Sequence, residues 1–293
     1  MLTIFSCPKP FIGHINIIQR NAIQSWLKLT PKCEVILFGD DEGVNEVAKE
    51  FDLIHIPKIE KSKQGTPLLS SVFNYAQNSA LNDTLVFVNA DIILFNDLIN
   101  SIKNINFPKY LVSGRRWDLD INQELIFETD DWKDELLEKV KKEGRLHKIT
   151  GKDYFIFKKG TVKMLPLAVG RVFWDDWFLY HMRQNGIPII NATNAIKVIH
   201  QNHDYSHSKF GKKTHVSGPE MKDNYKLIGG GTNILSLKDA DWSLYDFGLK
   251  KPPIKYLIFN ILSYFYVWRL LMNMKYKISR KLSRLGIRNP FYD

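Results

Sequence analysis

Short apolar runs alternate with amphipathic segments from the first residues of the chain to residue 113. The runs have the length of strands, and the segments between them, such as 15–29 and 44–51, carry apolar residues at helical spacing; the strand-like runs lie at 2–7, 34–38, 53–56, 85–88 and 110–113. Such alternation is typical of βαβ units, in which helices join parallel strands. We therefore predict an α/β fold with a mostly parallel sheet flanked by helices.

The pattern changes after residue 116. Residues 117–150 are acidic and then of mixed charge, and 134–143 have the Glu and Lys spacing of an exposed helix, so we predict an insertion over the edge of the sheet. Further strands and one helix follow, at 154–157, 174–184, 187–191 and 196–200. The polar, glycine-rich residues 201–249 are expected to form a loop-rich cap. We place one large domain at residues 1–249, which is enough chain to bury a substantial core.

The positive charge of the chain is concentrated in residues 250–293. This segment has ten basic residues and one acid, a net charge of +9, whereas residues 1–249 have 31 basic and 30 acidic residues. Within it, 256–273 are apolar with Arg269 as the one charge. We predict basic amphipathic helices that bind an anionic membrane surface; the alternative is a helical tail that packs on the body or forms an oligomer. A near-neutral body argues against nucleic acid as the substrate.

Cysteine content and the N-terminal sequence bear on the compartment. Cys7 and Cys33 are the two cysteines, with neither metal-type spacing nor the number needed for a disulfide framework. The first residues lack the basic start and the long apolar run of a signal peptide. We expect a cytoplasmic protein that is peripheral to the membrane.

The stretch "LVFVNADIILF" at 85–95 places a carboxylate just after a predicted buried strand. In open α/β sheets, ligands bind beyond the carboxyl ends of the strands. Asp91 at that edge is suited to bind Mg²⁺ or Mn²⁺, which prefer oxygen ligands. Capping of the following helix is an equally good interpretation from this stretch alone.

Two further stretches carry candidate functional groups. "VFWDDWFLYHMRQ" contains Asp175 and Asp176 between two tryptophans, and either a general base or an ordinary pair of acids at a helix start fits this pattern. "IHQNHDYSH" contains His200, His203 and His207, but it lacks helical character and a HExxH glutamate, so one histidine serving a metal is expected rather than a dedicated zinc site.

Other polar residues adjoin predicted strands and would share the same edge. They are Asp40 and Asp41, the Gly65-Thr66-Pro67 turn, Arg115 and Arg116, and Gly151-Lys152-Asp153. Arginine at such an edge suits a diphosphate or another anion. The chain contains no P-loop, GxGxxG or GxSxG motif, so NTPases, dinucleotide-dependent dehydrogenases and serine hydrolases lack their signatures.

The order of these motifs over residues 1 to about 205 resembles a GT-A fold glycosyltransferase of the nucleotide-diphospho-sugar transferase superfamily. The family's DxD motif, which binds a divalent cation and the donor diphosphate, corresponds to Asn89-Ala90-Asp91, with Asn in place of the first acid. Its acceptor-activating acid corresponds to Asp176, beside Asp175, and its late metal-binding histidine to His200.

The resemblance implies a role for each candidate residue. It implies donor binding by Asp40, Gly65, Thr66, Asn89, Asp91, Arg115 and Arg116, metal binding by Asp91 and His200, and acceptor binding by Asp153, Trp117, Trp174, Trp177 and His203. The cofactor would be Mn²⁺ or Mg²⁺. The partners would be a nucleotide-sugar donor and a saccharide or lipid-linked saccharide acceptor.

The implied activity is sugar transfer, with inversion, in the synthesis of a surface polysaccharide or another glycan. Two alternatives remain open. A sugar-phosphate nucleotidyltransferase shares the fold, but usually has a Gly-rich, basic loop after its first strand, and "CPKPFIGHIN" contains one glycine. A non-catalytic carbohydrate-binding or scaffold protein would tolerate the asparagine at position 89.

Overall fold

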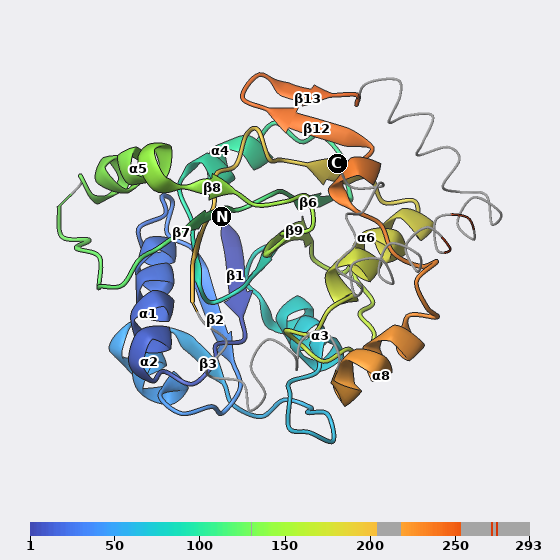
Figure 1. Cartoon of the computed structure of the whole chain (residues 1–293), viewed down its shortest axis with the longest axis horizontal. Coiled ribbons are helices and arrows are strands. Elements are labelled where there is room, and N and C mark those ends of the chain that lie inside the picture. Colours follow the sequence, from blue (N-terminus) through green and yellow to red (C-terminus); the bar gives the residue numbers. More distant parts are fainter. Residues whose placement is uncertain (130, 204–217, 253–270, 272–273, 275–293) are drawn as a thin grey trace, which may run out of the picture.

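The computed structural model describes residues 1–129, 131–203, 218–252, 271 and 274. In this part of the chain, nine strands form one sheet in the order β13-β12-β10-β6-β9-β4-β1-β2-β3 (Figure 1). They are β1 (Leu2–Ser6), β2 (Glu34–Phe38), β3 (Ile54–Ile56), β4 (Thr84–Val88), β6 (Leu111–Ser113), β9 (Tyr154–Lys158), β10 (Ile189–Asn191), β12 (Trp242–Tyr245) and β13 (Gly248–Lys250).

Most strands of this sheet run in one direction. β3, β2, β1 and β4 are parallel neighbours, and so are β6, β10 and β12. β9 lies antiparallel between β4 and β6, and β13 is antiparallel to β12 at the edge. The predicted α/β class with a mostly parallel sheet is confirmed, and seven strands end at the same edge.

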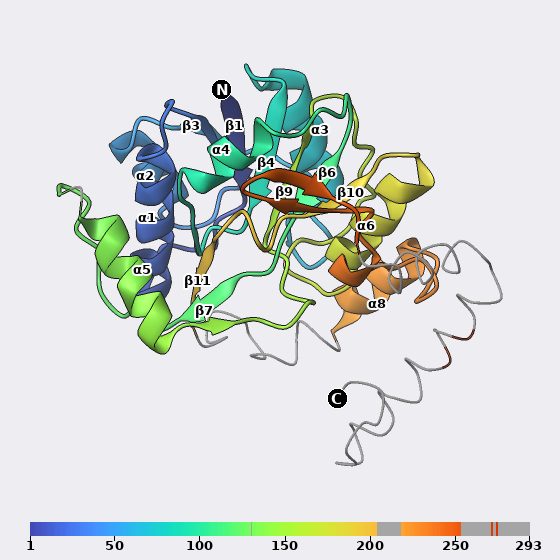
Figure 2. The ribbon, with the colours of Figure 1, turned by 90° about the horizontal axis from the view of Figure 1, so that it is seen from above.

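Helices cover both faces of the sheet (Figures 1 and 2). Ile4, Leu37 and Val86 point to the face that packs against α1 (Gly13–Leu27), α2 (Val44–Glu50) and α4 (Asp97–Ile102). Their neighbours Phe5, Ile36 and Phe87 point to the face covered by α3 (Leu69–Ser79), α6 (Trp174–Gln184) and α8 (Pro219–Leu227). Burial on both faces explains why the strands are continuously apolar.

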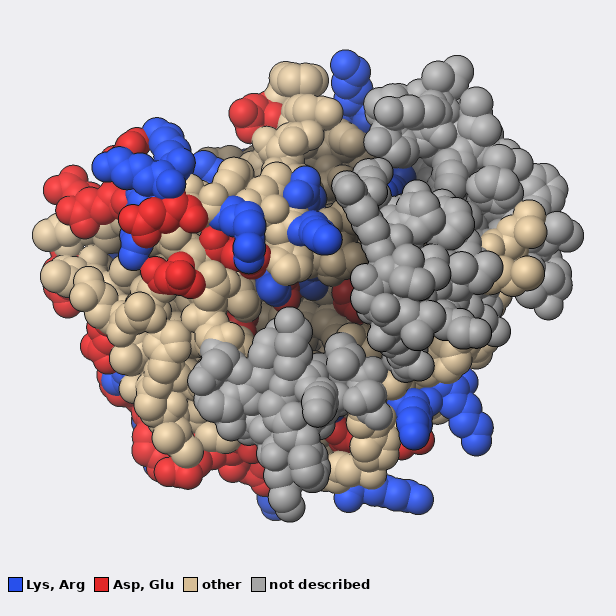
Figure 3. Space-filling model, in the orientation of Figure 1, with Lys and Arg blue, Asp and Glu red and all other residues tan. Residues whose placement is uncertain are grey.

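A second, four-stranded sheet has the order β5-β11-β7-β8 and comprises β5 (Ile92–Ile93), β7 (Trp117–Leu119), β8 (Arg145–Leu146) and β11 (Ile199–Gln201). Residues 117–150, predicted as an insertion, supply β7, α5 (Trp132–Glu143) and β8. Leu136 and Val140 of α5 pack on Leu119 and Ile199, while acidic and basic side chains lie next to each other on its outer surface (Figure 3). β7 pairs with β11 so that Asp118 lies opposite His200.

The segment expected to be a loop-rich cap is more regular than predicted. Within 218–250 it forms α8, a 3₁₀ turn at Leu237–Asp239, and the hairpin β12–β13, which extends the main sheet. The predicted tail helices lie outside the described residues, except for positions 250–252, 271 and 274. Among the described residues, no helix has both the length and the apolar character needed to cross a membrane.

Candidate active site

A cleft of about 800 Å³ lies at the edge of the main sheet where its parallel strands end. Cys7 to Pro10 follow β1, Asp41 follows β2, and Asn89 to Asp91 follow β4. Because β9 runs in the opposite direction, Gly151 to Asp153 reach the same edge from its beginning. The topology therefore gathers residues from distant parts of the sequence around one cavity.

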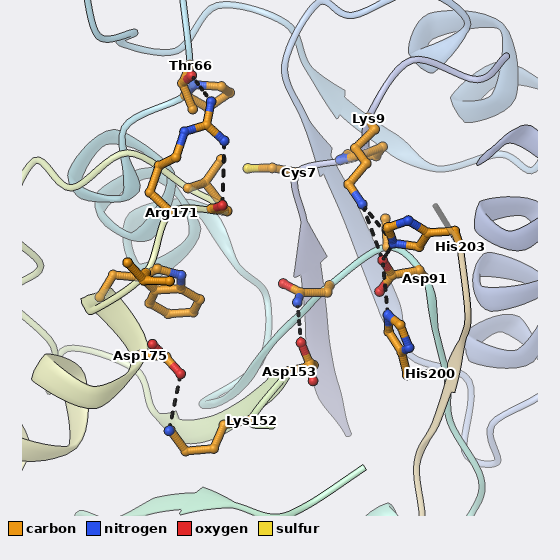
Figure 4. Close-up of a pocket in the computed structure, with 18 of the residues that line it drawn as sticks. Cys7, Lys9, Thr66, Asp91, Lys152, Asp153, Arg171, Asp175, His200 and His203 are labelled. Carbon is orange, nitrogen blue, oxygen red and sulfur yellow. Dashed lines mark hydrogen bonds and ion pairs between the residues drawn. The ribbon is translucent and has the colours of Figure 1, made fainter. Parts of the chain in front are cut away.

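Asp91 is buried against two histidines and a lysine. Its Oδ2 lies 3.3 Å from Nε2 of His203, 3.5 Å from Nζ of Lys9 and 3.9 Å from Nε2 of His200 (Figure 4). Two hydrogen bonds from Gln201, of 3.3 and 3.2 Å, hold its backbone carbonyl. Burial opposes ionisation of Asp91, but Lys9 and the histidines outweigh it, so the pKa of this carboxyl is well below its usual range.

The possible metal ligands at and beside Asp91 fit a divalent cation. Ligand atoms of Asp91, His200 and His203 all lie within 4.8 Å of one another. Oδ1 of Asp91 is buried and has no hydrogen-bond partner among the described residues. A buried carboxylate oxygen without a partner is costly, and a metal ion would satisfy it.

Asp118 contacts His200 through the ring nitrogen that faces away from Asp91. Its Oδ1 lies 3.5 Å from Nδ1 of His200, and its Oδ2 lies 2.6 Å from Nδ1 of His147. Nε of Arg116 donates to Asp118 at 3.0 Å. Burial raises the pKa of Asp118, but the two histidines and the arginine lower it more, so the group is ionised. A carboxylate behind a metal-binding histidine orients the ring and selects its tautomer.

Asn89 has a structural partner that explains why an amide stands there. Its Nδ2 donates to Oδ1 of Asp153 at 2.7 Å, and its backbone N–H donates to the carbonyl of Asp153 at 2.9 Å. Arg116 donates to the other oxygen of Asp153 at 2.7 Å. An aspartate at position 89 would instead place two carboxylates against each other.

Asp175 and Asp176 lie in the first turn of α6 and share a buried lysine. Nζ of Lys152 is 3.1 Å from Oδ2 of Asp175 and 2.6 Å from Oδ1 of Asp176. Neither acid occupies the capping position, which is Phe173, and both line the cleft. Desolvation raises the pKa of Asp176 to about 6 even though Lys152 lowers it. A carboxylate with such a pKa can accept a proton near neutral pH.

On the opposite wall of the cleft, Arg171 contacts both Glu220 and Thr66. Its Nε and Nη2 lie 2.8 and 2.7 Å from Oε2 of Glu220, and Nη2 also donates to the hydroxyl of Thr66 at 3.1 Å. Glu220 is 4% exposed and also accepts a hydrogen bond from Ser62. These contacts connect the turn that contains Gly65 and Thr66 with α8.

The cleft gathers eleven of the predicted site residues. Its lining includes Gly65, Thr66, Asn89, Asp91, Arg116, Asp153, Trp174, His200 and His203, in addition to Asp175 and Asp176.

Four other predicted residues do not line the cleft. Asp40 pairs with Lys61 at the surface, and its neighbour Asp41 lines the cavity instead. Arg115 donates to the carbonyl of His147 at 2.6 Å. Trp117 packs against the core of the second sheet, and Trp177 is buried and stacks on His181. Packing, the commoner role of tryptophan, accounts for both.

Several functional candidates were not assigned a role from the sequence. Each of four residues contacts a predicted one: Lys9 contacts Asp91, Asp118 contacts His200, the carbonyl of His147 accepts from Arg115, and Arg171 donates to Thr66. Lys152 was named among the edge residues but was given no role. Lys9 lies in the loop after β1, and loops after parallel strands meet at one edge, so this position was a usable signal. Asp118 carried no such signal because only the register of β7 and β11 brings it to His200.

No family model matches the chain, and no curated protein sequence matches it. Similar solved structures include a candidate nucleotide-diphospho-sugar transferase from Desulfovibrio desulfuricans G20, with TM-score 0.40, 12% identity, and coverage of 78% of this chain and 96% of that one. Another is glucosyl-3-phosphoglycerate synthase from Mycobacterium tuberculosis with Mn²⁺, UDP and glucosyl-3-phosphoglycerate, with TM-score 0.40, 12% identity, and coverage of 69% and 72%.

A third is a mannosyltransferase from Pyrobaculum calidifontis in complex with GDP-Man and Mn²⁺, with TM-score 0.44, 14% identity, and coverage of 70% of this chain and 58% of that one. These proteins are of the class that the sequence resemblance predicts. TM-scores of this size are too low to transfer an activity, so the function has to follow from the residues of the cleft.

Proposed function

We propose that the chain is a glycosyltransferase that moves a sugar, a hexose or a pentose, from a nucleotide-diphosphate donor to a hydroxyl group of an acceptor. One observation carries the proposal. On one side of the cleft lie two imidazoles and a buried carboxylate, one of whose oxygens has no hydrogen-bond partner among the described residues (Figure 4). On the other side, a lysine bridges two carboxylates.

Asp91, His200 and His203 would hold Mn²⁺ or Mg²⁺. Two imidazole ligands favour Mn²⁺, because Mg²⁺ prefers oxygen ligands alone. Five carboxylates and four basic side chains line the cleft, a net charge of −1 with neutral histidines, so an anionic diphosphate needs added positive charge to bind there. When bound, the cation offsets the negative charge that develops on the departing diphosphate.

Asp176 would act as the general base. It takes the proton from the acceptor hydroxyl while the hydroxyl oxygen bonds to the anomeric carbon. The bond from that carbon to the diphosphate oxygen breaks, and its electron pair leaves with the diphosphate. Attack from the side opposite the leaving group inverts the configuration. Lys152 and Asp175 hold Asp176 in place, and Trp174 offers a flat apolar wall for a sugar ring.

The acceptor would be a saccharide or a lipid-linked saccharide, as in the synthesis of a surface polysaccharide. We propose that residues 250–293 hold the enzyme at an anionic cytoplasmic membrane surface. Support for this comes from the charge of +9 and the adjacent apolar run.

Two variants test the activity. We expect Asp91→Ala and Asp176→Asn each to lower transfer by about 100-fold or more, because each removes a group that acts in the transition state. The exposed Asp246 supplies matched controls, Asp246→Ala and Asp246→Asn. A thermal-shift screen with nucleoside diphosphates, with and without Mn²⁺, identifies the donor class beforehand.

Full activity in either variant, with the folded state intact by circular dichroism, would remove the role assigned to that residue. Release of pyrophosphate from a nucleoside triphosphate and a sugar phosphate would indicate a nucleotidyltransferase instead. Binding of sugar with no donor turnover under any condition would indicate a non-catalytic protein.

A further inference from the structure

Lys9 combines a fixed backbone with a movable side chain. It lies between Pro8 and Pro10 in the loop after β1. Its N–H donates to Oε1 of Gln19 at 2.7 Å, and Nε2 of Gln19 donates back to its carbonyl at 2.8 Å. Gln19 is 1% exposed, so these two hydrogen bonds are shielded from water and hold the backbone of Lys9 in place. The side chain of Lys9 is 33% exposed and can change its rotamer without moving the loop.

The ammonium of Lys9 contacts two of the three side chains that would bind the cation. Nζ lies 3.5 Å from Oδ2 of Asp91 and 3.2 Å from Nε2 of His203. Nε2 of His203 also lies 3.3 Å from Oδ2 of Asp91, so the same ring nitrogen faces both the ammonium and the carboxylate. A divalent cation held by these side chains would also repel the neighbouring ammonium, because both are positively charged.

The other basic groups of the cleft are bound more firmly. Arg116 bridges Asp118 and Asp153, Lys152 bridges Asp175 and Asp176, and Arg171 is paired with Glu220. Their side chains are 16% exposed or less, against 33% for Lys9. Lys9 is therefore the lining cation that can leave its partners at least cost, because an incoming metal ion takes over the charge of Asp91.

We propose that Lys9 competes with the divalent cation for Asp91 and His203, and that its displaced ammonium then pairs with the diphosphate of the donor. This inference rests on the proposed function. One residue would thus keep the buried carboxylate neutralised before the cation binds and add a positive charge to the diphosphate site afterwards. Cation and diphosphate would each strengthen the binding of the other, since such coupling is reciprocal.

Binding of Mn²⁺ alone to the full chain, measured by calorimetry and by electron paramagnetic resonance of free Mn²⁺, tests the competition. We expect Lys9→Met to bind Mn²⁺ about tenfold more tightly than the wild type, or about 1.4 kcal/mol. Lys9→Arg, which keeps the charge, should not show this gain. Lys49→Met is the matched control, because it removes the same charge from an exposed position on α2.

Binding of UDP, GDP, ADP and CDP at saturating Mn²⁺ tests the second half of the inference. For the nucleotide that the wild type binds, Lys9→Met should bind about tenfold more weakly, and Lys49→Met should match the wild type. Opposite effects of one substitution on the two ligands are not expected from a loss of folding.

The possible failures can be told apart. Equal or weaker Mn²⁺ binding by Lys9→Met, with Mn²⁺ bound by the wild type and lost in Asp91→Ala, would overturn the role of Lys9 and leave the proposed function standing. Absence of Mn²⁺ binding in the wild type would overturn both the inference and the metal site of the proposed function. Tighter Mn²⁺ binding without weaker nucleotide binding would overturn the pairing with diphosphate.

Discussion

Lys152 is a buried charge whose two partners are the candidate acids of the reaction. Its side chain is 0% exposed, and despite this burial Asp175 and Asp176 raise its pKa above the ordinary value. A buried ammonium remains ionised only while carboxylates neutralise it. The three groups therefore act as one unit with a net charge of −1, and Lys152 controls how readily Asp176 accepts a proton.

This unit makes activity depend on pH. Asp176 has a pKa raised to about 6 and serves as a base only when ionised, so kcat/KM should fall as pH drops below about 6. In Lys152→Met, burial and the charge of Asp175 raise the pKa of Asp176 further, and the acid limb should move up by about one pH unit or more. The measurement is the pH profile of kcat/KM, with Lys49→Met as control. An unchanged acid limb would contradict this role for Lys152.

Asp118 is expected to set the affinity for the cation through His200. Removing the carboxylate behind a metal-binding histidine typically weakens metal binding by about 10-fold to 100-fold, and we expect this range for Asp118→Asn. Asp120→Asn, at the exposed residue that follows the end of β7, is the control. Mn²⁺ binding measured by calorimetry decides the matter: equal affinity in both variants would show that Asp118 serves the fold alone.

Single residues were predictable where the surrounding stretch of sequence suggested a chemical role. Asp91, Asp175, Asp176 and His200 stood in stretches whose composition already suggested chemistry, and all four line the cleft. The partner of Asn89 could not be read from the sequence, because only the antiparallel pairing of Val88 with Tyr154 brings Asp153 beside it.

At the scale of elements, α8 supports the cleft through one ion pair. Arg171 and Glu220 have side chains that are 16% and 5% exposed, and Glu220 also binds Ser62. Burial raises the pKa of Glu220, but its hydrogen bonds and Arg171 lower it more, so the charged pair stabilises the native state above the pKa of the unfolded chain and loses that effect in acid.

Glu220→Gln should therefore lower the free energy of unfolding by about 3 kcal/mol at neutral pH, because it leaves Arg171 buried without its counter-charge. Urea denaturation at pH 7 measures this loss, and the difference from wild type should shrink as pH falls below about 4, where the glutamate of the unfolded chain takes up a proton while native Glu220 stays ionised to lower pH. Glu124→Gln, at an exposed position, is the control. A difference that stays constant with pH would contradict the electrostatic explanation.

Elements with a clear apolar pattern were predictable, including β2 and α6, whereas the hairpin β12–β13 was not. The predicted bounds of β2 and α6 agree with the structure at both ends, since their apolar patterns run over several residues bounded by turns. The hairpin β12–β13 was missed because its strands have four and three residues and include Ser243 and Lys250. The contacts of β12 with β10, over 50 residues earlier, decide its structure.

At the scale of the whole molecule, charge separates the chain into two parts. Residues 1–249 carry a net charge of +1, and residues 250–293 carry +9. The cleft itself is lined by more acids than bases. We therefore expect an anionic surface to attract residues 250–293 more strongly than the cleft.

This separation predicts salt-dependent binding to membranes. The full chain should co-sediment with vesicles containing phosphatidylglycerol and not with vesicles of phosphatidylcholine alone. Each basic residue near an anionic surface contributes about 1 kcal/mol, so replacing four of them with Gln should weaken partitioning by at least about 100-fold. The four are Lys275, Lys277, Arg280 and Lys281; the matched control replaces four exposed lysines of the body, Lys49, Lys58, Lys133 and Lys142.

The two quadruple variants change the net charge equally, so only the position of the charge differs between them. If the tail variant loses vesicle binding and the body variant keeps it, the tail binds the surface. If both variants lose binding to the same extent, overall charge is responsible instead. Binding that persists in the tail variant at high salt would point to insertion of the apolar residues 256–273, because ionic strength screens charge and leaves burial of apolar surface in force.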